Sequence, residues 1–266
     1  MKKTLAFLAM TAALAAPMAA QAHRAWMAPS ATVLSGNDAF VGFDAGMSNV
    51  VYQADHAAMR LSGLEITAPD GSKLEAQNNH LSRYRSTFDV ELKQEGTYRV
   101  ANVSQGFMAL YEQGGERKRF RGSEAEFATA MPADATNVQA SRTFSRTETF
   151  VSLGNPNTTA LAATGQGLEL VPVTHPNDAA EGETSTFKLV LNGQPASNVD
   201  VTIARGGQRY RGASEEITTK TAADGTFSVT WAAPGLHWLG ASVRTEGAAG
   251  QPGTNASYNG TIEVLP

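Results

Sequence analysis

The chain contains no cysteine among its 266 residues. Disulfide bonds, thiolate metal sites and cysteine nucleophiles are therefore excluded, and a metal site has to use His, Asp, Glu, Met or a free amine. Without cross-links the fold depends on its hydrophobic core, for which a chain of this length suffices. A lipid-modified N-terminus is excluded as well, because there is no cysteine to acylate.

The chain also lacks an excess of basic residues and long apolar runs. Its formal net charge of −4 argues against nucleic acid or an anionic membrane as a partner, since both require basic surfaces. A local basic run at 116–122 is flanked by Glu112 and Glu124, which is typical of a solvated loop or an edge strand. After the first residues, no stretch reaches the ~20 apolar residues that a membrane helix needs.

The first 22 residues have the three parts of a secretory signal peptide. Lys2 and Lys3 precede an apolar run from Leu5 to Ala16, and Ala20-Gln21-Ala22 forms a small-x-small ending. We therefore expect export to the periplasm, cleavage after Ala22 and no membrane insertion after cleavage; the alternative is an uncleaved anchor. Removing the two lysines of this segment changes the net charge from −4 to −6.

The remaining sequence predicts an all-β protein. Short runs of β-branched and aromatic residues alternate with turn dipeptides such as Asn192-Gly193 and Asp224-Gly225. The alternation within 86–104 predicts a hairpin around Gln94-Glu95-Gly96, and 123–131 favours a short helix begun by Ser123. Such spacing is typical of β-sandwiches of the immunoglobulin-like or transthyretin-like kind.

Two tandem sandwiches fit the length and the composition. A stretch rich in Gly, Asn, Thr and Pro predicts a linker at 156–167, between an N-terminal domain at 23–155 and a C-terminal domain at 168–266. Motifs of enzymes are missing: there is no phosphate-binding glycine loop, no G-x-S-x-G, no H-E-x-x-H and no S-x-x-K. We therefore expect a protein that is not an enzyme.

The five histidines are the most informative residues, and His23 differs from the other four. Cleavage after Ala22 places its imidazole and a new α-amine on one residue, where the two can chelate a metal together. An α-amine has an ordinary pKa of about 7.7, so it can lose its proton near neutral pH. Nitrogen ligands of these kinds suit nickel, cobalt, copper and zinc.

A single histidine does not make a metal site, and His56 is the candidate second ligand. Asp55 beside it can bind the metal directly or orient the imidazole. The alternative is that Asp55 caps a short helical turn that starts at His56. His237, in the run Pro-Gly-Leu-His-Trp, is a lesser candidate, and the alternative favoured by its setting is an ordinary residue at the start of a strand.

Several segments together resemble a known family. They are "AHRAWMAPS", "VGFDAGMSNVVYQADHAAMRL", "GLELVPVTHPND" and "TAADGTFSVTWAAPGLHWLGA", and the resemblance extends over about 23–245. It is to a domain-of-unknown-function family of exported bacterial proteins, commonly described as the periplasmic component of cobalt/nickel uptake systems. The resemblance implies a periplasmic two-part β protein that handles a divalent transition metal, with His23 and Asp55-His56 at the family's own positions. The second half also resembles a transthyretin-like or carboxypeptidase-regulatory-like module.

Three functions are open at this point. The first is a periplasmic binding protein for nickel, cobalt or copper that delivers its metal to a membrane transporter. The second is a non-catalytic pair of sandwich modules that binds a protein or a glycan. The third is a mononuclear copper oxidase of polysaccharides, which also begins with a chelating histidine but has a small, glycine-rich opening that "RAWMAPS" lacks.

Overall fold

The computed structural model describes residues 23–212, 215–248 and 251–266. The predicted signal peptide, residues 1–22, lies outside these ranges. Nearly all regular structure is β-strand, as the alternating pattern predicts. Within the described ranges, no helix has the length and apolar content needed to cross a membrane.

The elements follow one another along the chain with few helical interruptions. The strands are β1 (Arg24–Pro29), β2 (Val33–Leu34), β3 (Ala39–Ser48), β4 (Ala57–Ala58), β5 (Leu64–Thr67), β6 (Lys73–Leu74), β7 (Gln77–Leu81), β8 (Ser86–Leu92), β9 (Gly96–Gln113), β10 (Glu116–Gly122), β11 (Thr136–Leu153), β12 (Leu168–Pro172), β13 (Thr184–Leu191), β14 (Gln194–Pro195), β15 (Asp200–Arg205), β16 (Glu216–Lys220), β17 (Thr226–Thr230), β18 (Gly235–Thr245) and β19 (Gly253–Val264). The helical elements are α1 (Glu124–Ala130) and the 3-10 turns η1 (Thr159–Leu161), η2 (Pro176–Asp178) and η3 (Gln208–Tyr210).

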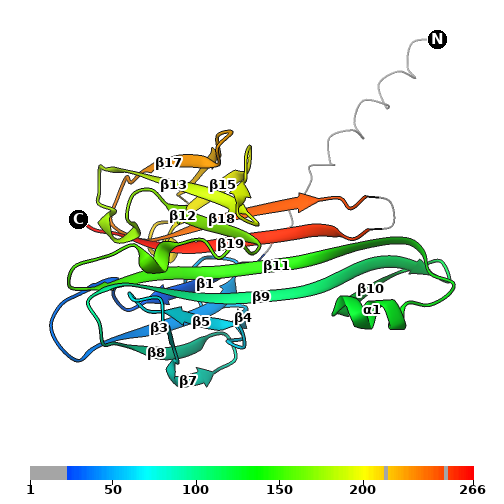
Figure 1. Ribbon diagram of the computed structural model, residues 1–266, viewed down its shortest axis with the longest axis horizontal. Helices are drawn as coiled ribbons and strands as arrows, with labels where there is room; N and C mark the ends of the chain where they lie inside the picture. The colour runs from blue at the N-terminus through cyan, green and yellow to red at the C-terminus, as the bar shows by residue number, and fades with distance from the viewer. Residues whose placement is uncertain (1–22, 213–214, 249–250) are drawn as a thin grey trace, which may run out of the picture.

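Three sheets stack as two sandwiches around a shared middle sheet (Figure 1). The lower sheet has the order β1-β3-β8-β7, with β4 on β3. The middle sheet has the order β16-β15-β18-β19-β11-β9-β5-β6, with β10 on β9 and β2 on β11. The upper sheet consists of β12, β13, β14 and β17. The fold is therefore an all-β pair of sandwiches.

Two hydrophobic cores correspond to the two sandwiches. The lower core lies between the lower and middle sheets and is built on large side chains such as Phe43, Phe88, Val90, Tyr98 and Val151. The upper core lies between the middle and upper sheets and includes Phe150, Phe187, Trp231, Leu239 and Tyr258.

Strand β11 contributes to both cores. Adjacent residues of a strand point to opposite faces, and so Phe150 enters the upper core while Val151 enters the lower one. The same strand pairs antiparallel with β9 and parallel with β19, from Ser141–Gly253 to Thr149–Thr261. In the segment predicted as a linker, Leu161 is buried in the upper core. The boundaries at 155 and 168 stay a prediction.

The hairpin predicted at 86–104 is wrong. Strands β8 and β9 do alternate as expected, but β8 pairs with β3 in the lower sheet and β9 pairs with β11 in the middle sheet. The turn at Gln94-Glu95-Gly96 therefore crosses from one sheet to the other. Burial explains this arrangement: Phe88 and Val90 of β8 face Tyr98 and Val100 of β9 across the lower core, and side-by-side pairing would not bring these faces together.

The turns of the second half agree with the sequence pattern. Asn192 and Gly193, with φ of 51° and 78°, join β13 to β14. Positive φ at both central residues is the backbone that Asn-Gly adopts in a tight hairpin. The turn at Asp224-Gly225 separates β16 from β17, and Pro234-Gly235 precedes β18.

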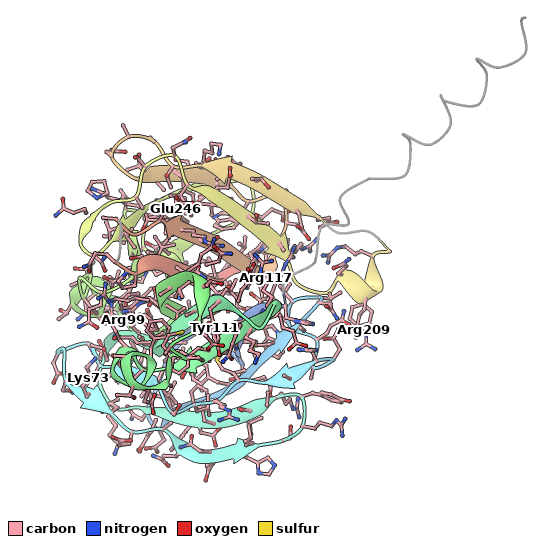
Figure 2. All side chains as sticks on the ribbon, turned by 90° about the vertical axis from the view of Figure 1, so that its right-hand side faces the viewer. Lys73, Arg99, Tyr111, Arg117, Arg209 and Glu246 are labelled. Atoms are coloured by element: carbon pink, nitrogen blue, oxygen red, sulfur yellow. The ribbon has the colours of Figure 1, made fainter. Side chains whose placement is uncertain are left out.

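The long strands β9 and β11 continue beyond both sandwiches as an arm that also carries β10 and α1 (Figure 1). Helix α1 begins as predicted, because Ser123 accepts a hydrogen bond from Glu126 N and the Glu126 carboxylate accepts one from Ser123 N. Phe127 of the helix packs on Phe107 and Phe120. Figure 2 looks onto the end of the arm, where Tyr111 and Arg117 lie.

A buried charge cluster ties β11 to β12. The Arg146 guanidinium lies 3.3 Å from a carboxylate oxygen of Glu148 and 3.3 Å from one of Glu169. The same two carboxylates are almost fully buried. Glu169 also accepts hydrogen bonds from the backbone N–H groups of Thr164, Gly165 and Gln166. The segment before β12 is thereby wrapped around a charged side chain.

Candidate metal-binding site

The two leading candidate ligands lie against each other. The rings of His23 and His56 are stacked with their centroids 3.4 Å apart and their planes 8° from parallel. Both side chains are exposed to solvent. The structure therefore brings together two histidines that are 33 positions apart in the sequence, whereas metal binding by this pair stays a prediction.

Strand β1, which follows His23, is held in place by contacts with the lower sheet and with the middle sheet. Arg24 pairs with Ser48 at the end of β3, and the buried Trp26 donates a hydrogen bond from Nε1 to Ser48 Oγ at 2.7 Å. From the middle sheet, Trp238 Nε1 donates to the backbone oxygen of Ala25 at 2.8 Å. The start of β1 is thus attached to both sandwiches, and His23 extends from a fixed strand end.

The loop that carries His56 is held by Tyr52. Its hydroxyl donates to Thr261 Oγ1 of β19 at 3.1 Å, and its ring packs edge-on against Trp26 with centroids 5.9 Å apart. Burial raises the pKa of Tyr52. A Cβ at Gly206 would lie 2.8 Å from Tyr52 Cδ2, so glycine is needed there. Tyr52 itself has φ of 61°, an uncommon value for an aromatic residue.

The positive charge next to His23 is compensated. Arg24 Nη2 lies 2.9 Å from a Glu216 carboxylate oxygen, and its guanidinium carbon lies 4.9 Å from the centroid of the Trp238 ring. An unpaired guanidinium beside the histidines would oppose the approach of a cation. The ion pair with Glu216 reduces that opposition.

Asp55 does not contact the histidine rings through any hydrogen bond in the described residues, and its carboxylate instead accepts a hydrogen bond from Asn49 N at 3.4 Å. This contact closes the loop between β3 and β4. The helical turn considered for His56 is wrong, because Ala57 and Ala58 form strand β4, which pairs with Met47 and Gly46 of β3. Cross-strand pairing with β3 satisfies this backbone instead.

His237 lies elsewhere. Its ring packs edge-on against Trp231 with centroids 5.1 Å apart, and its Nδ1 lies 2.9 Å from the backbone oxygen of Gly235. Burial lowers the pKa of His237. Neighbouring residues of β18 face opposite ways, so Trp238 points toward β1 and His237 points into the upper sandwich. The structure does not bring His237 to the histidine pair.

The other two histidines are also apart from the pair. His80 lies on β7, at the exposed edge of the lower sheet. His175 Nε2 lies 2.9 Å from Thr97 Oγ1, and its Nδ1 accepts a hydrogen bond from Asn177 N. His175 therefore connects the two sandwiches.

Two imidazoles alone make an incomplete site. Among the described residues, no three or more His, Asp or Glu side chains gather closely enough to hold a metal ion. A third donor has to be of another kind, and two kinds are available: the α-amine created by cleavage before His23, and a thioether. Imidazole, amine and thioether donors fit a transition metal, whereas calcium and magnesium require oxygen ligands.

A hollow of 560 Å³ opens beside His23 and supplies such a thioether. Its lining includes His23, Met47 and Asn49 of the lower sandwich and Asp200 of the middle sheet. Met47 stands nine positions before His56 in the sequence, but only the strand register shows that it shares a hollow with His23. A separate cleft of 520 Å³ is lined by Trp26, Tyr52, Asp55 and Tyr210 among others.

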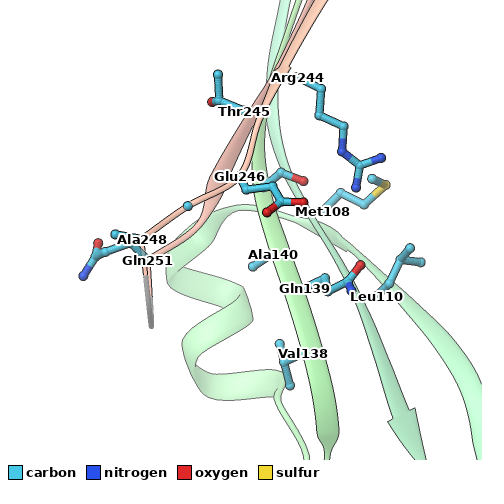
Figure 3. Close-up of a pocket in the computed structure, with 13 residues that line it drawn as sticks. Met108, Leu110, Val138, Gln139, Ala140, Arg244, Thr245, Glu246, Ala248 and Gln251 are labelled. Carbon is cyan, nitrogen blue, oxygen red and sulfur yellow. The ribbon is translucent and has the colours of Figure 1, made fainter.

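A further hollow lies on the arm, away from the histidines (Figure 3). Met108, Leu110 and Val138 form its apolar floor, and Arg244 and Glu246 stand at its rim. Its volume is 330 Å³. With a single carboxylate in its lining, this hollow is no competitor for the metal.

The solved structures that match this chain have low sequence identity to it and low TM-scores. The D0-D1 domain of intimin is 14% identical, with 90% of this chain and 97% of that chain covered and a TM-score of 0.23. The human OSCAR ligand-binding domain is 14% identical, with 91% and 99% covered and a TM-score of 0.22. Escherichia coli alpha-2-macroglobulin is 11% identical, with 92% and 31% covered and a TM-score of 0.24. At these values the likeness carries no argument about function.

The comparison with protein families, unlike the comparison with solved structures, shows to which family the chain belongs. No curated protein matches the chain. A family model described as a domain of unknown function, DUF4198, matches residues 20–245, which include His23, His56 and the whole arm but not β19. The chain belongs to this DUF4198 family.

Proposed function

We propose that the mature protein is a periplasmic, non-catalytic binding protein for a divalent transition metal, namely nickel, cobalt or copper. It assists metal uptake by delivering the ion to a membrane transporter. The stacked pair of His23 and His56 carries this proposal, because one of its members, His23, is the first residue after the expected cleavage site. The description of similar exported proteins as components of cobalt/nickel uptake systems supports the same function.

The chemistry of the pair is suited to a metal that is bound and then released. An imidazole nitrogen binds a metal through a lone pair in the plane of its ring, so two parallel rings need a turn of one ring before both can bind one ion. Both rings are exposed, and such a turn breaks no buried packing. The α-amine of His23 completes a three-nitrogen set. An open site of this kind leaves positions free for a receiving protein.

A titration of the secreted, cleaved protein with Ni²⁺, Co²⁺ and Cu²⁺ tests this proposal. N-terminal sequencing first establishes that the chain starts at His23. We expect one equivalent of metal to bind, and His56→Ala or one extra alanine before His23 to weaken binding by at least about tenfold, the equivalent of 1.4 kcal/mol. His80→Ala, which removes an exposed histidine of the same sandwich, is the matched control. Equal affinity in all four proteins would refute the proposal.

A protein-binding or glycan-binding module is the second candidate, and one observation favours it. Tyr210, 83% exposed, stands at the cleft that Trp26 and Tyr52 also line. Aromatic side chains that remain exposed are common at recognition surfaces. Under this function Tyr210→Ala abolishes partner binding and leaves metal affinity unchanged.

A further inference from the structure

We infer that this site is built to hold copper in its cuprous state, with the thioether of Met47 as the third donor beside His23 and His56. The inference rests on the proposed function, since it uses the same histidine pair, and it adds a monovalent ion to the divalent ions named there. Thioether sulfur is a soft ligand that selects Cu⁺, whereas nickel and cobalt are served by the nitrogen donors alone. The chain has no cysteine, so methionine is its sole source of sulfur.

The strand register places Met47 between the two segments that carry the histidines. On one side Met47 pairs with Ala25 of β1, two residues after His23. On the other side it pairs with Ala57 of β4, the residue after His56. Residues two apart on a strand share a face, so His23 lies on the face of Met47, and diagonal cross-strand neighbours are about 7–8 Å apart, within reach of a long side chain. The register does not place His56 on this face, because His56 is one residue from Ala57; its ring joins the site by stacking on the ring of His23. Met47 and His23 accordingly line the same hollow.

The surroundings of Met47 favour a ligand over a core residue. Along β3 the alternate residues Val41, Phe43 and Ala45 are buried in the lower core, but Met47 is 36% exposed. The hollow around it is lined by polar and apolar residues in similar measure, and the polar ones include Asn49, Ser145, Asp200, Thr202, Ser257 and Asn259. An apolar side chain gains little by facing an open hollow in which it stays exposed to solvent. The exposed position of Met47 is therefore better explained by a role of its sulfur as a metal ligand.

The amine and the thioether then serve different oxidation states. With Met47, the two imidazoles give Cu⁺ three donors without the α-amine. Ni²⁺ and Cu²⁺ draw on the amine, because nitrogen ligands suit both ions and a thioether is a poor ligand for them. A block on the amine therefore weakens binding of the divalent ions and spares that of Cu⁺.

The test is an oxygen-free competition for Cu⁺ between the cleaved protein and a coloured Cu⁺ chelator such as bathocuproine disulfonate. Met47→Leu keeps the size of the side chain and removes the sulfur. We expect this variant to lose at least about tenfold in Cu⁺ affinity and to bind Ni²⁺ like the unaltered protein. Met108→Leu, on the arm, is the matched control and should change neither. Unchanged Cu⁺ affinity in Met47→Leu would overturn the inference.

A second readout is independent of affinity. With methyl-¹³C-labelled methionine, the NMR signal of the Met47 methyl group should shift on addition of Cu⁺, while those of Met27, Met59 and Met108 stay in place. No shift at Met47 would also overturn the inference. His56→Ala separates the proposed function from the inference about Met47. If His56→Ala loses affinity for every metal and Met47→Leu loses none, the histidine pair binds the metal and the Met47 thioether does not. If His56→Ala is without effect, the proposed function itself fails.

Discussion

Replacing Arg146 with methionine is expected to lower the free energy of unfolding by about 3–5 kcal/mol, because it removes the guanidinium that pairs with two buried carboxylates. The guanidinium lies 3.3 Å from a carboxylate oxygen of each of Glu148 and Glu169. Both glutamates are 1% exposed, so water cannot replace the lost partner. Urea unfolding followed by tryptophan fluorescence measures the loss.

The loss should also depend on pH, and its direction follows from Glu148. Burial raises the pKa of Glu148, and the charge of Arg146 works against that rise. Without Arg146 the pKa of Glu148 rises further in the folded protein. A group whose pKa is higher in the folded than in the unfolded protein binds more protons when folded, so stability increases as the pH falls through the folded pKa. The deficit of Arg146→Met should therefore shrink between pH 8 and pH 5.

Arg142→Met provides the matched control on the same strand. Arg142 pairs with Glu124 at 2.7 Å, but both side chains are about half exposed. An exposed pair of this kind contributes about 0–1 kcal/mol. If the two variants lose equal stability, or if the deficit of Arg146→Met is the same at pH 5 and pH 8, the buried cluster does not act as described.

Replacing Trp26 with alanine is expected to cost about 3–5 kcal/mol in the free energy of unfolding and to weaken metal binding as well. Trp26 is 2% exposed and packs beneath both histidine segments. Its Nε1 holds Ser48, and its ring packs against Tyr52 of the loop that leads to His56. Removing the ring leaves a cavity and releases the β1 end and the loop from their common support.

Trp231→Ala separates the two effects. Trp231 is 1% exposed in the upper core and donates from Nε1 to Ser185 Oγ, away from the histidine pair. It should cost a similar amount of stability, and at a temperature where both variants are folded it should leave the affinity for Ni²⁺ unchanged. Equal metal affinity in Trp26→Ala and Trp231→Ala would show that Trp26 supports the fold and not the site.

Local pattern was sufficient to predict the strands, many of the turns and the short helix. Asn192-Gly193 and Ser123 each specify a backbone conformation through their own chemistry. The partner of a strand is a different matter, because alternation reports one buried face and not which strand lies beside it. For that reason β8 and β9 resemble a hairpin in sequence, yet they belong to two different sheets.

The same limit applies to the candidate site. The pairing of His23 with His56 could be proposed from the residue types and the expected cleavage point, and the two rings are in contact. The orientation of His237 could not be predicted, because one step along β18 moves a side chain from the β1 side to the upper sandwich. Met47 is recognisable as a neighbour of His23 only through its pairing with Ala25.

If His23 and His56 bind one metal ion together, two imidazoles coordinate that ion, and their number can be measured. Electron spin-echo envelope modulation of the cleaved, Cu²⁺-loaded protein counts the imidazoles that coordinate copper. We predict two imidazoles on the copper in the unaltered protein and one in His56→Ala. A single imidazole in both proteins, or two in both, would contradict it.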